Sequence, residues 1–178
     1  MYIVRQEAMC VLRVTTNRRT LTDFLFASRI PFYEAHDKNT PRSLGRNKGK
    51  PFGYAGFQSD VSGREWDDLP GQASDAVRFL RHYKADLKRL RQRFKVRDLR
   101  LDFPYYLRIG RNNIAVQCDF LPPVLIALAG ELGVGIEMTL YPPPRAPKRT
   151  RKSPTRRSTE PPPSKSATSS GVRRGGGR

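Results

Sequence analysis

The sequence has few of the residues on which disulfide frameworks, metal sites and membrane spans depend. Its 178 residues include two cysteines, Cys10 and Cys118, and two histidines, His36 and His82. Two cysteines are too few for a secreted disulfide framework. Both fall at inward positions of strands that we predict, so we expect two buried free thiols. No apolar run approaches the roughly 20 residues of a transmembrane helix, and we expect no membrane span.

Patterns that carry catalysis or bind cofactors are also lacking. Residues 45–50 read GRNKGK, but a phosphate-binding loop has four residues between its glycines and Ser or Thr after the lysine, where this chain has Pro51. His36-Asp37 could meet Asp60 across a hairpin and hold a metal, yet no ligand spacing supports this. We therefore predict no catalytic residue, no metal site and no cofactor, and keep an enzyme as a minor alternative.

Acidic residues are scarce relative to basic ones. Lys and Arg total 34 against 16 Asp and Glu, a formal net charge of +18. Residues 143–178 hold 11 basic residues and one acid, which leaves 23 basic and 15 acidic residues in residues 1–142. The net charges of the two parts are therefore +10 and +8. Such an excess predicts attraction to polyanions, either nucleic acid or an acidic membrane surface.

The last 36 residues are rich in Pro, Ser and Arg and have no aromatic side chain. Because they cannot bury enough apolar surface to offset the entropy of ordering, we predict a disordered polybasic tail over 143–178 after a globular domain over 1–142. The basic residues of the tail that we expect to bind nucleic acid are Lys148, Arg149, Arg151, Lys152, Arg156 and Arg157.

A second basic segment, residues 37–51, is rich in Gly, Pro and Asn and carries five positive charges and one negative charge. A loop of this length inside a compact domain is often functional. The side chains that we expect to contact nucleic acid here are Arg42, Arg46, Lys48 and Lys50.

Hydrophobic periodicity predicts alternating strands and helices in the domain. The expected strands are 8–15, 30–36, 52–61, 99–103, 114–118 and 136–140, and the expected helices are 21–27, 68–94 and 124–132. The order predicts an α+β fold, an antiparallel-dominated sheet with helices on one face. It is the ferredoxin-like β-α-β-β-α-β order followed by a further β-α-β.

Two other groups could bind nucleic acid, although an ordinary structural role accounts for each. The helix over 68–94 carries a basic back of Arg78, Arg81, Lys88 and Arg89, which could simply face water. Tyr105-Tyr106 with Arg108 and Arg111 could stack bases and hold phosphates, or could form the edge of a hairpin.

Four segments carry a resemblance to known proteins: LDF, AVQCDFLPPVLIALAGELGVGIEMTLYP, LTDFLFASRIPFYEAHDKNTPR and QASDAVRFLRHYKADLKRL. Over about Met9 to Pro142 the chain resembles a group of small bacterial proteins of unknown function. The resemblance implies a bacterial, cytoplasmic α+β protein and assigns no activity, substrate or catalytic residue.

We thus expect a non-enzymatic binding protein whose basic tail and loop engage a polyanion, which we take to be nucleic acid bound without sequence specificity. The alternative is a module that binds a protein partner, such as an immunity or antitoxin-like protein, with an incidental tail.

Overall fold

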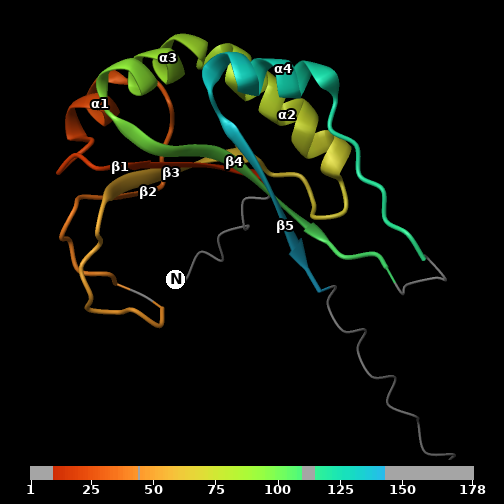
Figure 1. Ribbon diagram of the computed structural model, residues 1–178, viewed down its shortest axis with the longest axis horizontal. Coiled ribbons are helices and arrows are strands. Elements are labelled where there is room, and N and C mark those ends of the chain that lie inside the picture. Colours follow the sequence, from red (N-terminus) through yellow and green to blue (C-terminus); the bar gives the residue numbers. More distant parts are fainter. Residues whose placement is uncertain (1–9, 44, 110–114, 143–178) are drawn as a thin grey trace, which may run out of the picture. The chain divides into compact units, whose positions relative to one another are not determined.

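The computed structural model describes residues 10–43, 45–109 and 115–142. These residues form an α+β fold, a mixed five-stranded sheet with four helices (Figure 1). The strands are β1 (Cys10–Thr16), β2 (Glu34–His36), β3 (Ala55–Ser62), β4 (Val96–Tyr106) and β5 (Gly135–Tyr141). The helices are α1 (Thr22–Ala27), α2 (Leu69–His82), α3 (Lys84–Arg93) and α4 (Pro123–Leu132). The predicted disorder of residues 143–178 lies outside the described residues.

The strand order in the sheet is β2-β3-β1-β4-β5. β1 pairs antiparallel with both β3 and β4, and β2 pairs antiparallel with β3. β5 pairs parallel with β4, because α4 carries the chain back along the sheet between these two strands. Antiparallel pairing therefore dominates, as predicted, while the parallel edge makes the sheet mixed.

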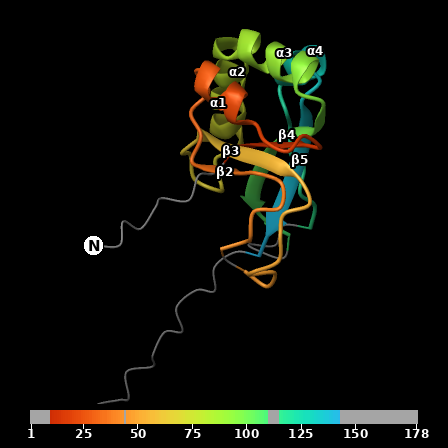
Figure 2. The ribbon, with the colours of Figure 1, turned by 90° about the vertical axis from the view of Figure 1, so that its left-hand side faces the viewer.

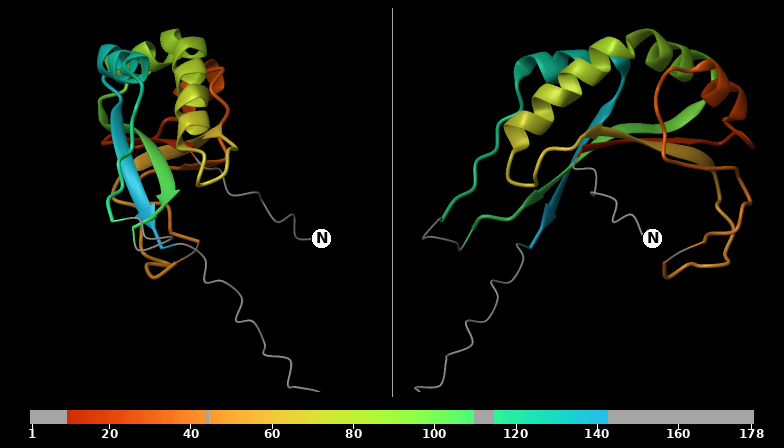
Figure 3. Two further views of the ribbon diagram at one scale, coloured as in Figure 1. Left: turned by 90° about the vertical axis from the view of Figure 1, so that its right-hand side faces the viewer. Right: turned by 180° about the vertical axis from the view of Figure 1, so that it is seen from behind.

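All four helices lie on one side of the sheet, as Figures 1, 2 and 3 agree. The core lies between the two layers. On the sheet it contains alternate residues of β1 and β4, such as Leu12, Val14 and Leu101, which are at most 1% exposed. On the helices it contains Leu80 and Leu87, which are fully buried. The period-2 and period-3.6 patterns thus identified the inward faces correctly.

The single long helix predicted over 68–94 is wrong in one respect, because the chain bends at Tyr83 between α2 and α3. Its start is confirmed, since the Asp68 side chain accepts a hydrogen bond from the Gly71 amide at 2.9 Å. A straight helix of this length would extend roughly 40 Å. The bend keeps Leu87 and Leu90 in the same core as α2.

The strand predicted over 114–118 is also wrong for the described residues 115–118, which are not in a strand. The edge of β4 that a hairpin strand would need is occupied by β5. Val116 is 72% exposed and Cys118 is exposed, whereas the polar Gln117 is half-buried and accepts a hydrogen bond from the Arg108 amide at 2.8 Å. The predicted further β-α-β therefore consists of α4 and β5 alone within the described residues. The expectation of two buried thiols is also wrong, because Cys10 is buried and Cys118 is exposed.

The helix that begins after Pro122 is confirmed as α4. It ends at Gly133, which has a left-handed conformation with φ of 60° that favours glycine.

Among the described helices, none combines the length and the apolar character that crossing a lipid bilayer would take.

Candidate polyanion interface

The basic loop between β2 and β3 is an ordered extension of their hairpin. We call residues 38–50 the basic hairpin; Leu44 within it lies outside the described residues. Backbone hydrogen bonds continue the pairing beyond the strands, from the Asn39 amide to the Phe52 carbonyl at 2.8 Å and from the Phe52 amide to the Thr40 carbonyl at 3.0 Å. Further out, the Arg42 amide bonds the Lys50 carbonyl at 3.0 Å. The hairpin extends to the side of the sheet away from the helices (Figure 1).

Two glycines close the tip of the basic hairpin. Gly45 and Gly49 have φ of 80° and 82°, in the left-handed region that side chains other than glycine rarely adopt. The Lys48 amide bonds the Gly45 carbonyl at 3.0 Å, and the Gly49 amide bonds the Arg42 carbonyl at 2.9 Å. These turns give Arg42, Arg46, Lys48 and Lys50 defined backbone positions on one short hairpin.

Aromatic rings pack at the base of the basic hairpin. The rings of His36 and Phe52 stack with centroids 3.7 Å apart, and Tyr54 meets the His36 ring edge-on at 5.4 Å. The guanidinium carbon of Arg42 lies 4.2 Å from the centroid of Phe52, a cation–π contact. The stack therefore fixes the direction of one of the four predicted binding cations.

The ring of His36 belongs to this stack. Within the described residues neither ring nitrogen of His36 has a hydrogen-bond partner, and no group of three potential metal ligands occurs there. Burial lowers the pKa of His36 below its usual value, the nearby carboxylate of Glu34 opposes this effect, and the Arg42 cation adds to it. The imidazole thus packs as a mainly neutral ring.

Four cations of the basic hairpin have no acidic partner, whereas nine other basic residues of the described part of the chain are held in ion pairs. In residues 10–43, 45–109 and 115–142, no carboxylate forms an ion pair with any of the four cations. These four are Arg42, Arg46, Lys48 and Lys50. Arg46, Lys48 and Lys50 are also exposed. The basic hairpin therefore presents uncompensated positive charge to solvent.

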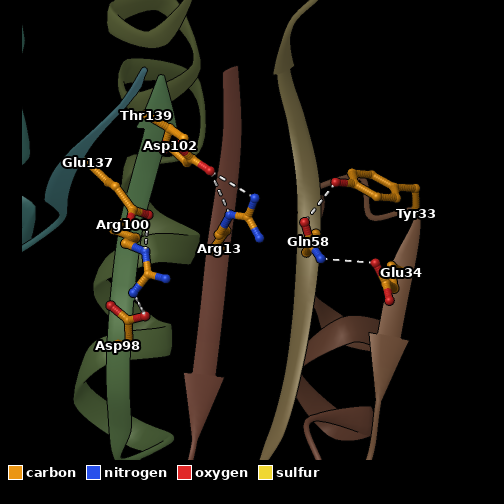
Figure 4. Close-up of polar contacts among 9 residues, drawn as sticks. All are labelled: Arg13, Tyr33, Glu34, Gln58, Asp98, Arg100, Asp102, Glu137 and Thr139. Atoms are coloured by element: carbon orange, nitrogen blue, oxygen red, sulfur yellow. Dashed lines mark hydrogen bonds and ion pairs between the residues drawn. The ribbon is translucent and has the colours of Figure 1, made fainter. Parts of the chain in front are cut away.

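The face of the sheet away from the helices, by contrast, pairs its own charges (Figure 4). Arg13 of β1 donates to Asp102 of β4 at 3.0 Å, and the Thr139 hydroxyl of β5 donates to the other oxygen of Asp102 at 2.6 Å. Arg100 bonds both Asp98 and Glu137. These arginines are already neutralised by carboxylates and are poor candidates for phosphate contacts.

On β2 and β3 the same face carries neutral and acidic groups. Gln58 donates to Glu34 at 2.9 Å and accepts from the Tyr33 hydroxyl at 2.9 Å (Figure 4). The named polar groups of this face are therefore already engaged with one another.

The other two groups that the sequence offered do not form open interfaces. Tyr105 is 8% exposed, Tyr106 packs on Trp66 with ring centroids 5.1 Å apart, and Arg108 is paired with Asp119. Arg111 lies outside the described residues. On the helices, Arg78 pairs with Asp75, Lys88 with Glu131 and Arg89 with Asp86, while Arg81 is exposed.

Sequence reasoning missed the role of His36, Phe52 and Tyr54 as the support of Arg42. The signal that could have found it is the continuation of the two flanking strands into the loop, which brings residues 36 and 52 together across a hairpin. The predicted tail residues Lys148, Arg149, Arg151, Lys152, Arg156 and Arg157 lie outside the described residues.

Comparison of the chain with protein-family models, with curated proteins and with solved structures found no match. The resemblance to small bacterial proteins of unknown function therefore remains a prediction from the sequence.

Proposed function

We propose that this protein is a non-enzymatic binding protein whose basic hairpin and basic tail engage nucleic acid without sequence specificity. The observation that carries the proposal is the set of four cations on an ordered hairpin that form no ion pair with a described carboxylate. An unpaired exposed cation can bind phosphate without first giving up a carboxylate partner. Nine other arginines and lysines of the described residues are already held in ion pairs.

Two physical features favour binding without sequence reading. The hairpin cations Arg46, Lys48 and Lys50 are exposed point charges near a turn, and contacts between such charges and phosphates release counterions but read no base edge. The tail adds 11 basic residues and one acid over residues 143–178. A segment of that composition attracts phosphates from a distance whatever the base sequence.

We also propose the finer fold assignment, a ferredoxin-like core of β1 to β4 with α4 and β5 appended. It is supported by the strand order β4-β1-β3-β2 within the sheet and by antiparallel pairing between each of these neighbours. A cytoplasmic location is part of the proposal as well. It is supported by Cys10 and Cys118, which are both free thiols.

A protein-partner module remains a second candidate because several large apolar side chains in α4 and in the segment before it are exposed. Phe120 is 73% exposed, Val116 is 72% exposed and Ile126 is 54% exposed. Exposed apolar patches mark interaction sites when their side chains are contiguous. This candidate predicts no affinity of the full chain for duplex DNA even at low salt.

A salt titration tests the proposal. The full chain is titrated with two duplexes of equal length and unrelated sequence at several salt concentrations. Non-specific phosphate binding predicts equal affinities for the two duplexes, and a linear fall of log affinity with log salt. Absence of binding at low salt, or a large preference for one duplex, would contradict it.

A further inference from the structure

A second group of unpaired basic side chains lies beside the base of the basic hairpin. It comes from three segments, the turn after β1, the C-terminal end of α3 and the first residues of β4. We call it the end cluster; its members are all exposed and are Arg18, Arg19, Arg93, Lys95 and Arg97. The three segments are far apart in the sequence, which is why no charge run reveals the cluster.

A buried threonine holds the three segments together. The Thr16 side chain is fully buried, and its hydroxyl lies 2.7 Å from the Phe94 carbonyl and 3.1 Å from the Lys95 carbonyl, to which it donates. The Arg18 amide donates to the same hydroxyl at 3.2 Å, and the Arg18 guanidinium donates to the Arg93 carbonyl at 2.7 Å. The backbone of the end cluster is therefore fixed by its own contacts.

Two backbone irregularities lie within the end cluster. Lys95 has φ of 47°, which is uncommon for a residue with a side chain. Thr15 pairs with Asp98 while Thr16 pairs with Val96, so Arg97 is an extra residue in β4. A bulge of this kind changes the direction in which a side chain leaves the strand. Strained backbone of this sort is concentrated at functional sites.

The charges of the end cluster are not neutralised within the described part of the chain. None of its five side chains forms an ion pair with a described carboxylate. The acidic residue that adjoins it in β4, Asp98, is paired with Arg100. The end cluster thus resembles the basic hairpin in its electrostatics.

The end cluster and the basic hairpin are in contact. The Lys38 amide, at the base of the hairpin, donates to the Arg19 carbonyl at 2.9 Å. The hairpin, the turn after β1 and the start of β4 lie at the same end of the sheet, on the left in Figure 1 and on the right in the right-hand view of Figure 3. The two basic groups are therefore joined through the backbone of Lys38 and Arg19.

We propose that the end cluster is a second contact for the phosphate backbone of the nucleic acid that the basic hairpin binds. This inference rests on the proposed function and extends its site from the basic hairpin to the adjoining end cluster. The ligand class follows from the chemistry: several exposed cations on a fixed backbone match the repeated phosphates of a polynucleotide.

The test uses the full chain with Arg19→Gln, Arg93→Gln and Arg97→Gln, none of whose side chains makes a hydrogen bond in the described structure. If all three contact phosphate, the slope of log affinity against log salt on a duplex falls by up to about 2.7, since each contact contributes about 0.9. The variant with Arg19→Lys, Arg93→Lys and Arg97→Lys keeps the charges and should keep the wild-type slope.

The matched control removes the same charge from another surface, with Arg81→Gln, Lys84→Gln and Lys88→Gln. A slope for the glutamine variant equal to that of the control overturns the inference. The inference is also overturned if the glutamine variant loses binding to vesicles of anionic phospholipid while its salt slope on the duplex stays at the wild-type value. The proposed function survives either result if substitution of the hairpin cations still lowers the slope on the duplex. Failure of this inference can therefore be distinguished from failure of the proposed function.

Discussion

The guanidinium carbon of Arg42 lies 4.2 Å from the centre of the Phe52 ring, and the His36 ring stacks on the same ring at 3.7 Å. A long, flexible side chain is thereby held by an aromatic support. Ordering Arg42 before a ligand arrives lowers the entropy that binding would otherwise cost. The stack therefore connects the structure of the loop to its proposed function.

Phe52→Leu should weaken duplex binding although it removes no charge. An exposed cation–π contact contributes about 0.5–1 kcal/mol, which corresponds to a loss of affinity of about two- to fivefold. The salt slope should not change, because every cation is still present. Affinity and slope are measured by titration of the full chain at several salt concentrations.

Phe26→Leu is the control for this substitution, because the Phe26 side chain is 89% exposed and lies in α1 rather than in the hairpin. It should leave the affinity unchanged. Equal affinities of the two variants would show that the Phe52 ring does not support binding.

His36 should make the stability of the domain depend on pH. Its pKa is lowered in the folded protein by burial, so the unfolded chain binds the proton more tightly. The free energy of unfolding should therefore decrease as the pH falls from about 7 through the usual histidine value of about 6.5 and down to the lowered pKa of the folded state. Thermal unfolding at a series of pH values measures this.

The variant His36→Phe keeps a ring in the stack and removes the titrating group. It should lose the part of the pH dependence that the wild-type protein shows in this window, whereas His82→Gln should retain it. A pH profile of His36→Phe that coincides with the wild-type profile would be incompatible with this account.

Thr16→Val should destabilise the domain. The substitution removes the hydroxyl that donates to the Phe94 and Lys95 carbonyls in a fully buried position. Leaving buried carbonyls without a partner costs about 1–3 kcal/mol of the free energy of unfolding. Thr15→Val, one residue away on the opposite face of β1, should change stability little. Denaturant unfolding of both variants decides the matter, and a Thr16→Val protein as stable as Thr15→Val would refute the role of the hydroxyl.

The tail should contribute to binding without contributing to stability. Replacement of Lys148, Arg149, Arg151 and Lys152 by Ala should lower the salt slope on a duplex by up to about 3.6 if all four contact phosphate. The melting temperature should stay the same, because a segment of this composition adds no packed core. A clear fall in melting temperature would falsify the predicted disorder of the tail.

Periodicity predicted the inward faces of the core elements well and their ends less well. The apolar residues that include Leu80 and Leu87 keep their helical spacing across the bend at Tyr83, because α2 and α3 both bury their apolar faces in the same core. A bend that leaves the stripe intact has no signal in the sequence. The position of the bend is visible only in the structure, where the Tyr83 ring packs on Phe79 with ring centroids 4.7 Å apart.

The segment before α4 shows why alternation alone can mislead. Val116 and Cys118 alternate with Gln117, which fits a half-buried strand. In the structure Val116 and Cys118 are exposed and the polar residue is the half-buried one, since Gln117 accepts a hydrogen bond from the Arg108 amide and donates to Asp119 at 2.7 Å. Alternation does not say which set of side chains is buried, and only the position of β5 at the sheet edge decides it.

The candidate interface could be predicted in part. The charges of Arg46 and Lys48 and their place in a loop are plain in the sequence. The end cluster is not, because the turn after β1 and the end of α3 meet through the buried hydroxyl of Thr16 and the guanidinium of Arg18. Contacts of this kind depend on the register of β1 against β4, which no local pattern gives.

The most direct test of the account is the salt dependence of duplex binding by the full chain with Arg42→Gln, Arg46→Gln, Lys48→Gln and Lys50→Gln. The matched control, Arg64→Gln, Arg78→Gln, Lys84→Gln and Lys88→Gln, removes the same charge from side chains that are held in surface ion pairs. The account predicts that the hairpin variant loses up to about 3.6 from the slope of log affinity against log salt, with no change in sequence preference, and that the control keeps a slope near the wild-type value. Equal slopes for the hairpin variant and the control would contradict it.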